Sequence, residues 1–166
     1  MTTATVKFRD PSPGDLGWVV HRHGVLYAQE YGWNLEFEAL VATVIGDFVK
    51  KFDAAYDRAW IVELDAKVVG SVFITRVAER SAKLRLLYVE PEARGHGIGR
   101  KLVDSALKFA RSAGYEEVVL WTNPLLTSAR KIYEASGFVM MEERTEQAFG
   151  GDFVSQTWKK DLRLGN

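Results

Sequence analysis

The sequence predicts an α/β fold in which a mixed sheet carries helices on its faces. The short apolar segment Leu84–Val89 has the composition of a buried strand, and from Gly97 onward the pattern changes to a helical period. A second segment, Leu35–Phe52, is strongly amphipathic with the spacing of a helix. The 166 residues are enough to bury one core, so we expect a single domain over residues 1–166.

The first third of the chain predicts one strand followed by helices. Thr3–Phe8 alternates like a strand and is followed by a proline- and glycine-rich turn. Asp15 is placed to cap a helix. Because Gly17 and Gly24 weaken a continuous helix, we expect two short helical pieces, Asp15–Arg22 and Val25–Tyr31.

The next elements are a capped helix and a hairpin. Asn34 is placed to cap the amphipathic segment that follows it. Trp60–Leu64 and Val68–Val77 read as strands joined by a tight turn. Gly70, inside the second strand, predicts a bulge or a close backbone contact.

The centre of the chain is a strand, a glycine-rich loop and a helix. Pro91 ends the Leu84–Val89 strand because proline has no N–H to donate to a sheet. Gly114 is placed to end the helix that follows the loop. One apolar stripe along this helix comprises Ile98, Leu102, Val103, Ala106, Leu107 and Ala110.

The loop itself has the composition of an anion site. It contains Gly95, Gly97 and Gly99, and it is flanked by Arg94 and Arg100. A helix N-terminus offers unpaired N–H groups, and glycines let phosphate oxygens approach them. The alternative is a tight turn in which the glycines only supply positive φ. Three glycines between two arginines favour the phosphate site, although no Gly-Lys-Ser/Thr of a P-loop follows.

The last third predicts a strand, a helix and a closing strand pair. Val118–Trp121 reads as a buried strand, and Thr127 or Ser128 is placed to cap the next helix. Val139–Arg144 and Asp152–Lys160 read as an antiparallel pair.

Two motifs together resemble the GCN5-related N-acetyltransferase (GNAT) family. The first is Arg-x-x-Gly-x-Gly at 94–99, after a strand that ends in Val-x-Pro. The second is the segment Ala129–Phe138, a helix with an inward tyrosine that ends at Gly-Phe. The resemblance covers roughly Val6 to Leu162. It implies a GNAT-like acyl-CoA acyltransferase fold, with a central, mostly antiparallel sheet, a splayed strand pair and helices on both faces.

The resemblance also implies an acetyl-CoA-dependent N-acetyltransferase and its site. Tyr133 matches the family's general acid, which protonates the departing thiolate. Asn123 could replace the family's asparagine, because that position is Leu126 here. The residues implied for acetyl-CoA, through strand or loop backbone, are Leu87, Tyr88, Val89, Arg94, Gly95, His96, Gly97, Ile98, Gly99 and Arg100. Among these, His96 is expected to face solvent.

The general base stays open. Many relatives carry a glutamate on the central strand, and this chain does not. Glu63, Glu36 and Glu38 are candidates, although each suits a solvated surface position equally well. His21 and His23 face different ways on a helix, so they do not predict a metal site. A single histidine facing the site is a further alternative.

The expected acceptor is a small primary amine or amino acid. Tyr27, Tyr31 and Trp33, followed by two glutamates, lie where such folds build the acceptor pocket, although core packing explains at least half of these rings. The amine would attack acetyl-CoA directly, since the chain has no cysteine to form a covalent intermediate. The alternatives are a non-catalytic acyl-CoA-binding sensor or regulatory module, and an enzyme whose acceptor is a protein amine.

Composition limits the other partners. The net charge is zero, which gives no electrostatic footprint for nucleic acid or an anionic membrane. No signal-peptide or membrane-spanning pattern is present, so we expect a cytoplasmic protein. No metal is expected. The closing strands, as sheet edges, can pair between subunits, which leaves a homodimer open.

Overall fold

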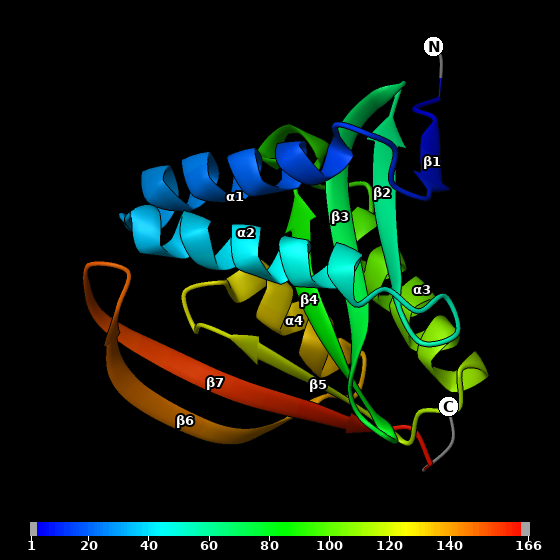
Figure 1. Ribbon diagram of the computed structural model, residues 1–166. Coiled ribbons are helices and arrows are strands. Elements are labelled where there is room, and N and C mark those ends of the chain that lie inside the picture. The colour runs from blue at the N-terminus through cyan, green and yellow to red at the C-terminus, as the bar shows by residue number, and fades with distance from the viewer. Residues whose placement is uncertain (1–2, 164–166) are drawn as a thin grey trace.

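The computed structural model describes residues 3–163. Within them, seven strands form one sheet in the order β1-β2-β3-β4-β5-β7-β6, and every neighbouring pair is antiparallel except β4 and β5 (Figure 1). The elements in chain order are β1 (Val6–Arg9), α1 (Asp15–Tyr31), α2 (Leu35–Lys50), β2 (Arg58–Leu64), β3 (Lys67–Ala78), β4 (Ser81–Val89), a 3-10 turn (Pro91–Ala93), α3 (Ile98–Ser112), β5 (Glu117–Thr122), α4 (Thr127–Ala135), β6 (Val139–Ala148) and β7 (Gly151–Asp161).

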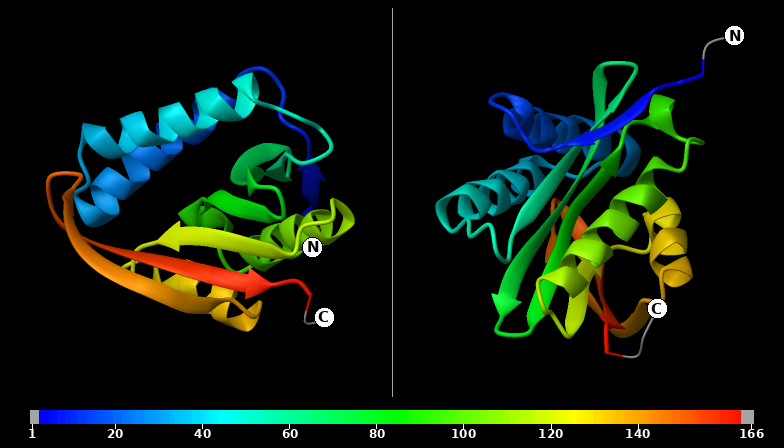
Figure 2. Two further views of the ribbon diagram at one scale, coloured as in Figure 1. Left: turned by 60° about the horizontal axis from the view of Figure 1, so that its bottom comes forward. Right: turned by 90° about the vertical axis from the view of Figure 1, so that its right-hand side faces the viewer.

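Helices cover both faces of the sheet, as predicted. Helices α1 and α2 lie on one face, and α3 and α4 lie on the other (Figure 2). The predicted apolar stripe of α3 is buried throughout against β2, β3, β4 and β5. On the opposite face, Val19 of α1 and Val41 of α2 pack against Ile61 and Phe73 of the sheet. None of the helices described within residues 3–163 is long and apolar enough to cross a membrane.

The prediction of two short N-terminal helices is wrong, because α1 is continuous from Asp15 to Tyr31. Its buried side chains, Val19, His23 and Leu26, recur at helical spacing, and tertiary packing outweighs the cost of the two internal glycines. At Gly24 an added Cβ would collide with the Glu38 side chain of α2. The Glu38 side chain therefore occupies the space beside α1 that this glycine leaves open.

Gly114 ends α3 with a positive φ of 88°, as predicted, and of the predicted N-terminal helix caps one is confirmed. The Asn34 side chain accepts the Glu36 N–H at 3.0 Å and caps α2. At α1 the cap position is Gly14, and the Asp15 carboxylate instead accepts the Ser12 N–H at 2.6 Å. At α4 the cap position is Leu126, with no side-chain hydrogen bond, so neither Thr127 nor Ser128 caps that helix.

The predicted β2–β3 hairpin and its bulge are confirmed. Asp65 and Ala66 both have positive φ, as a two-residue turn of this type requires. The register between β2 and β3 shifts beside Gly70, where Val62 pairs with Gly70 and Glu63 with Val68. A Cβ on Gly70 would lie 2.7 Å from the Tyr88 carbonyl oxygen, so β3 approaches the β4 backbone more closely than a side chain allows.

The closing strands are longer than predicted. Only Phe149 and Gly150 separate β6 from β7, because both have positive φ and close a two-residue turn. Residues 145–148 and Gly151, which were expected in a loop, therefore belong to the two strands. Strand β6 is the outer edge of the sheet, and almost all of its side chains are exposed.

Candidate active site

The glycine-rich loop joins β4 to α3 and leaves open space around its backbone. Gly95 and Gly97 have φ of 90° and 69°, and an added Cβ on either would meet nothing within 4 Å. Gly99 has a different role, since a Cβ there would lie 2.8 Å from Ile132 Cδ1 of α4. Two of the glycines thus shape the loop, and the third lets α4 pack against the start of α3.

A cavity of about 470 Å³ runs along this loop. Its wall includes the exposed backbone of 94–100 apart from His96, together with α1 residues and the first two turns of α4. Arg94 and Arg100 are each about half exposed, and Arg94 lies 3.5 Å from Glu30 of α1. We call this space the loop-side cavity. It combines helix N–H groups and arginines, which suits a phosphate-bearing ligand.

Strands β4 and β5 separate beside this cavity. Parallel pairing covers only Ser81–Leu84 with Glu117–Leu120. Leu86 has a positive φ of 54°, and the register with β3 shifts between Ser71 and Phe73. The end of β4 therefore turns away from β5 and presents unpaired backbone on that side. The predicted splay between these two strands is confirmed.

The three predicted strand residues lie at this splay. Leu87, Tyr88 and Val89 all border the loop-side cavity. The Tyr88 side chain is buried against His23, with ring centroids 4.9 Å apart, and its hydroxyl has no hydrogen-bond partner among the described residues. Burial raises the pKa of Tyr88. Any contact of Tyr88 with a ligand in the loop-side cavity is therefore most readily made by its backbone.

A second cavity of about 350 Å³ opens on the other side of the splay, under α2. We call it the acceptor-side cavity. Aromatic rings from five elements and one loop line it, and two pairs of them stack, Tyr27 with Phe37 at 5.1 Å and Trp121 with Phe153 at 5.3 Å. The two cavities share the wall residues Tyr27, Leu87, Leu126 and Ala129. They therefore meet where β4 leaves β5.

Tyr133 lies on α4 one helical turn after Ala129, which borders both cavities. It projects inward from α4, as predicted, is 5% exposed, and lines the acceptor-side cavity. Its ring packs edge-on against Phe138, with centroids 5.8 Å apart. Burial raises the pKa of Tyr133, so its hydroxyl stays protonated at neutral pH and can donate a proton.

Two of the predicted site residues are placed differently from the others. His96 is exposed and borders neither cavity, in line with its expected solvent-facing position. Asn123 is buried and borders the acceptor-side cavity only. Its Nδ2 donates to the Val154 carbonyl at 2.8 Å, and its Oδ1 accepts the Leu125 N–H at 2.8 Å. Asn123 thus holds the β5–α4 loop against β7, away from the loop-side cavity.

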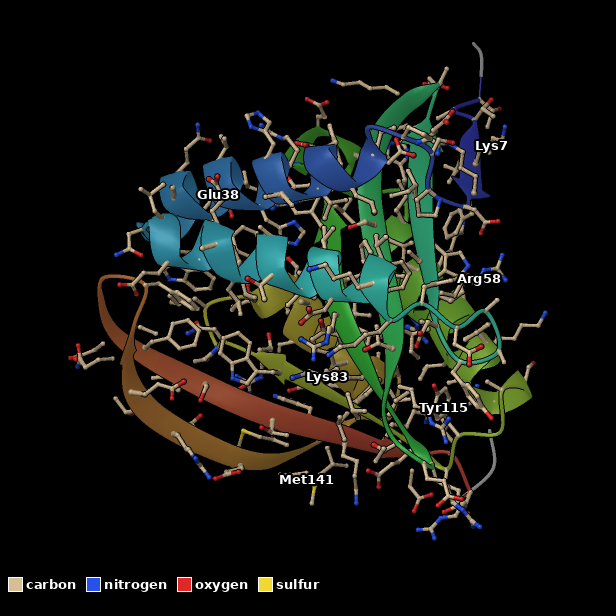
Figure 3. The ribbon with its side chains drawn as sticks, in the orientation of Figure 1. Lys7, Glu38, Arg58, Lys83, Tyr115 and Met141 are labelled. Atoms are coloured by element: carbon tan, nitrogen blue, oxygen red, sulfur yellow. The ribbon has the colours of Figure 1, made fainter. Side chains whose placement is uncertain are left out.

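The three candidate glutamate bases do not line the acceptor-side cavity. Glu63 pairs with Arg9 beside β1. Glu36 accepts the Phe149 N–H at 3.1 Å, and Glu38 lies against Gly24 where α1 meets α2 (Figure 3). None of the three carboxylates therefore borders the acceptor-side cavity, and Glu63 and Glu36 are already bound to other groups.

Of the two histidines only one reaches the site. His21 is exposed, whereas His23 is fully buried and borders the acceptor-side cavity. His23 Nδ1 lies 2.8 Å from the Val19 carbonyl oxygen. Burial lowers the pKa of His23 to about 4, so its ring is neutral at physiological pH. No cluster of His, Asp or Glu within residues 3–163 is arranged to hold a metal ion.

The sequence patterns missed the charged part of the acceptor-side cavity. Lys83 and Arg85 of β4 border it, as do Trp121 and Phe153 of the opposite strands. The signal was available in the strand, because Lys83 and Arg85 alternate with the buried residues Ala82 and Leu84. That alternation places both cations on the face toward α2.

This combination of a β4–β5 splay, a glycine-rich loop before a helix and a buried tyrosine defines an acyltransferase class. The model of the Acetyltransferase (GNAT) family matches residues 25–138. The chain therefore belongs to the GNAT family. It is 34% identical over 123 residues to human N-acetyltransferase 8B, and 34% identical over 139 residues to mouse N-acetyltransferase 8.

These alignments cover 70% and 80% of this chain but 52% and 58% of the two relatives, so the chain spans little more than half of their length. Solved structures share the fold at lower identity. A ribosomal-protein-alanine N-acetyltransferase from Brucella melitensis has a TM-score of 0.75 at 19% identity, covering 94% of this chain and 99% of that one.

Two further structures were solved with ligands. An acetyltransferase from Salmonella typhimurium with its cofactor acetyl-CoA has a TM-score of 0.74 at 16% identity, covering 95% and 94% of the two chains. Spermidine N-acetyltransferase from Vibrio cholerae, with CoA and spermine, has a TM-score of 0.72 at 20% identity, covering 95% and 96%.

Proposed function

We propose that this chain transfers an acetyl group from acetyl-CoA to a small primary amine, with Tyr133 as the general acid. The observation that carries the proposal is the junction of the two cavities at the splay, where Leu87 and Ala129 border both and Tyr133 lies beside them. A cofactor entering along the loop would meet an acceptor there. The non-catalytic alternative, an acyl-CoA sensor, has no need for a second cavity at this point.

The loop-side cavity fits the chemistry of acetyl-CoA. The pyrophosphate would bind N–H groups of 94–100, where Gly95 and Gly97 leave the approach free of Cβ atoms. The amide-bearing arm would pair with the free edge of β4 at Leu87–Val89, as a peptide adds to a sheet edge. Acetyl-CoA supplies the activated acetyl group as a thioester.

The transfer conserves atoms and charge without a covalent enzyme intermediate. The amine nitrogen attacks the thioester carbonyl carbon, a C–N bond forms, and the C–S bond breaks. The thiolate takes a proton from the Tyr133 hydroxyl, and the amine loses one proton to water, from which Tyr133 is reprotonated. Because burial raises the pKa of Tyr133 above that of a free tyrosine, its hydroxyl stays protonated until the sulfur departs, and it is then placed to donate a hydrogen bond and its proton to the developing thiolate.

A thiol-release assay tests this function directly. Acetyl-CoA and a panel of primary amines would be mixed with the protein, and free CoA would be followed with a thiol reagent. The chain has no cysteine, so the protein itself gives no background signal. Amine-dependent thiol release supports the enzyme. Binding of acetyl-CoA without release across the whole panel would instead favour the sensor.

A further inference from the structure

Two cations of β4 face the acceptor-side cavity without an ion-pair partner. Lys83 and Arg85 both border the cavity, and both are partly buried. Neither makes an ion pair within 4.0 Å among residues 3–163. Figure 3 shows Lys83 in the region between α2 and β5. Partly buried charges usually form ion pairs within the protein. The absence of such a partner for both Lys83 and Arg85 in the described part of the chain therefore suggests that a ligand supplies the opposite charge.

The surroundings do not offset these charges. Burial lowers the pKa of Lys83, and the neighbouring charge of Arg85 lowers it further. Burial also lowers the pKa of Arg85, although Asp47 of α2 acts in the opposite direction. Asp47 borders a different cavity, which Arg85 also borders, and it makes no ion pair with Arg85 within 4.0 Å. No Asp or Glu of the described residues borders the acceptor-side cavity.

Most of the remaining cavity wall is apolar or aromatic, although His23, Thr122 and Asn123 also border it. Trp33, Phe37, Trp121 and Phe153 line it, and its volume of about 350 Å³ lies at the small end of ligand pockets. A ligand that fills it can bury one ring or a large aliphatic group. Among the described residues that line the cavity, Lys83 and Arg85 are the ones that carry a charge at neutral pH.

We propose, on the basis of the acetyltransferase function proposed above, that the acceptor is an amine that also carries a carboxylate and an aromatic or large apolar group. Lys83 and Arg85 bind the carboxylate, and the aromatic wall takes the apolar group. The amine then lies toward Tyr133, where the two cavities meet. Such an acceptor supplies the anion that both cations lack.

The same charges also act on the reacting amine. A cationic wall lowers the pKa of a bound ammonium, because like charges disfavour the protonated form. The neutral amine is the nucleophile, so this wall favours the reactive form without a carboxylate base in the cavity. A polyamine, which carries several positive charges and no carboxylate, is disfavoured at the same wall.

Matched acceptor pairs test the proposal by thiol release. The pairs are phenylalanine with phenethylamine, tryptophan with tryptamine, and 4-(aminomethyl)benzoate with benzylamine, and spermidine is added as a polycation. Within at least one pair we expect kcat/KM to favour the carboxylated member by about 10- to 100-fold. In Lys83→Met and Arg85→Met this ratio should fall toward one, mainly through KM. The exposed Lys108→Met serves as the matched control and should keep the ratio.

A binding measurement separates failure of this proposal from failure of the acetyltransferase function. Trp33 and Trp121 line the cavity, so quenching of tryptophan fluorescence can report the acceptors that contain no indole, in the presence of CoA. Preferential binding of the carboxylated members, lost in Lys83→Met, supports the proposal even if no thiol is released. Equal binding within every pair, or preference for spermidine, overturns it even if thiol is released.

Discussion

The two cavities on either side of the splay differ in the chemical groups that they offer to a ligand. The loop-side cavity offers backbone groups for binding, at Gly95 and Gly97 of the loop and along the free edge of β4, beside the side chains of α1 and α4 that complete its wall. The acceptor-side cavity presents mostly side chains, with aromatic rings and the cations Lys83 and Arg85. Backbone groups are common to all sequences, so a site made from them recognises a constant ligand. A site made from side chains can change its ligand by substitution while the fold is retained.

The largest effect should come from blocking the backbone site. In Gly97→Glu a carboxylate enters the space where phosphates would bind, and we expect acetyl-CoA affinity to fall by on the order of 1,000-fold. Gly97→Ala is the matched control, because both variants strain a φ of 69° but alanine adds no charge. Isothermal titration measures both. Equal losses in the two variants would show that loop strain, rather than blocked anion binding, is responsible.

The next effect concerns the junction of the cavities. Tyr133→Phe removes the proposed proton donor and keeps the packing against Phe138, so kcat should fall by on the order of 100-fold. The affinity for acetyl-CoA should stay within about twofold, because the hydroxyl contributes to neither predicted phosphate nor strand contacts. Steady-state kinetics measures kcat, and isothermal titration of acetyl-CoA measures the affinity. Unchanged turnover removes Tyr133 from the mechanism.

A smaller effect tests the close packing beneath β4. Gly70→Ala places a Cβ 2.7 Å from the Tyr88 carbonyl, so β4 must shift, and we expect a loss of about 1–3 kcal/mol in unfolding free energy. Gly46→Ala is the control, since it lies in α2 with nothing within 4 Å and should gain about 0.5–1 kcal/mol from helix propensity. Chemical denaturation measures both. A neutral Gly70→Ala would contradict the inferred contact.

The last prediction concerns the free energy of unfolding, which the titration of His23 leaves unaffected at neutral pH and lowers in acid. Its pKa falls from 6.5 to about 4 on folding, so the neutral ring is favoured in the folded state. This contribution is fully present above pH 6.5 and is lost as pH falls through about 4, by on the order of 2–3 kcal/mol. Replacing His23 by Gln should flatten that part of the stability curve. The exposed His21→Gln should leave it unchanged, and identical curves for all three proteins would refute the assignment.

Sequence patterns predicted the backbone site well because its requirements are local. Glycine spacing, the strand before it and the stripe of α3 all lie within one continuous segment, and the structure has each where it was expected. The splay was predicted only from the family resemblance. At this point of β4, Leu86 has a positive φ, which the residue type leucine does not suggest.

The acceptor-side cavity was predicted less well because distant segments assemble it. Tyr27 and Trp33 come from the first third of the chain, whereas Trp121 and Phe153 come from β5 and β7. Their proximity depends on the strand order, which no local pattern specifies. The continuous α1 was missed for a related reason, since the burial of Val19, His23 and Leu26 against distant segments outweighs the cost of the two internal glycines.

The central claim is that backbone holds the cofactor and side chains choose the acceptor. Acetyl-CoA titrated into Gly97→Glu and Lys83→Met, beside wild type, tests it most directly. We predict that acetyl-CoA binding is lost in Gly97→Glu and unchanged within about twofold in Lys83→Met. A comparable loss in both variants would contradict the division of labour between the two cavities.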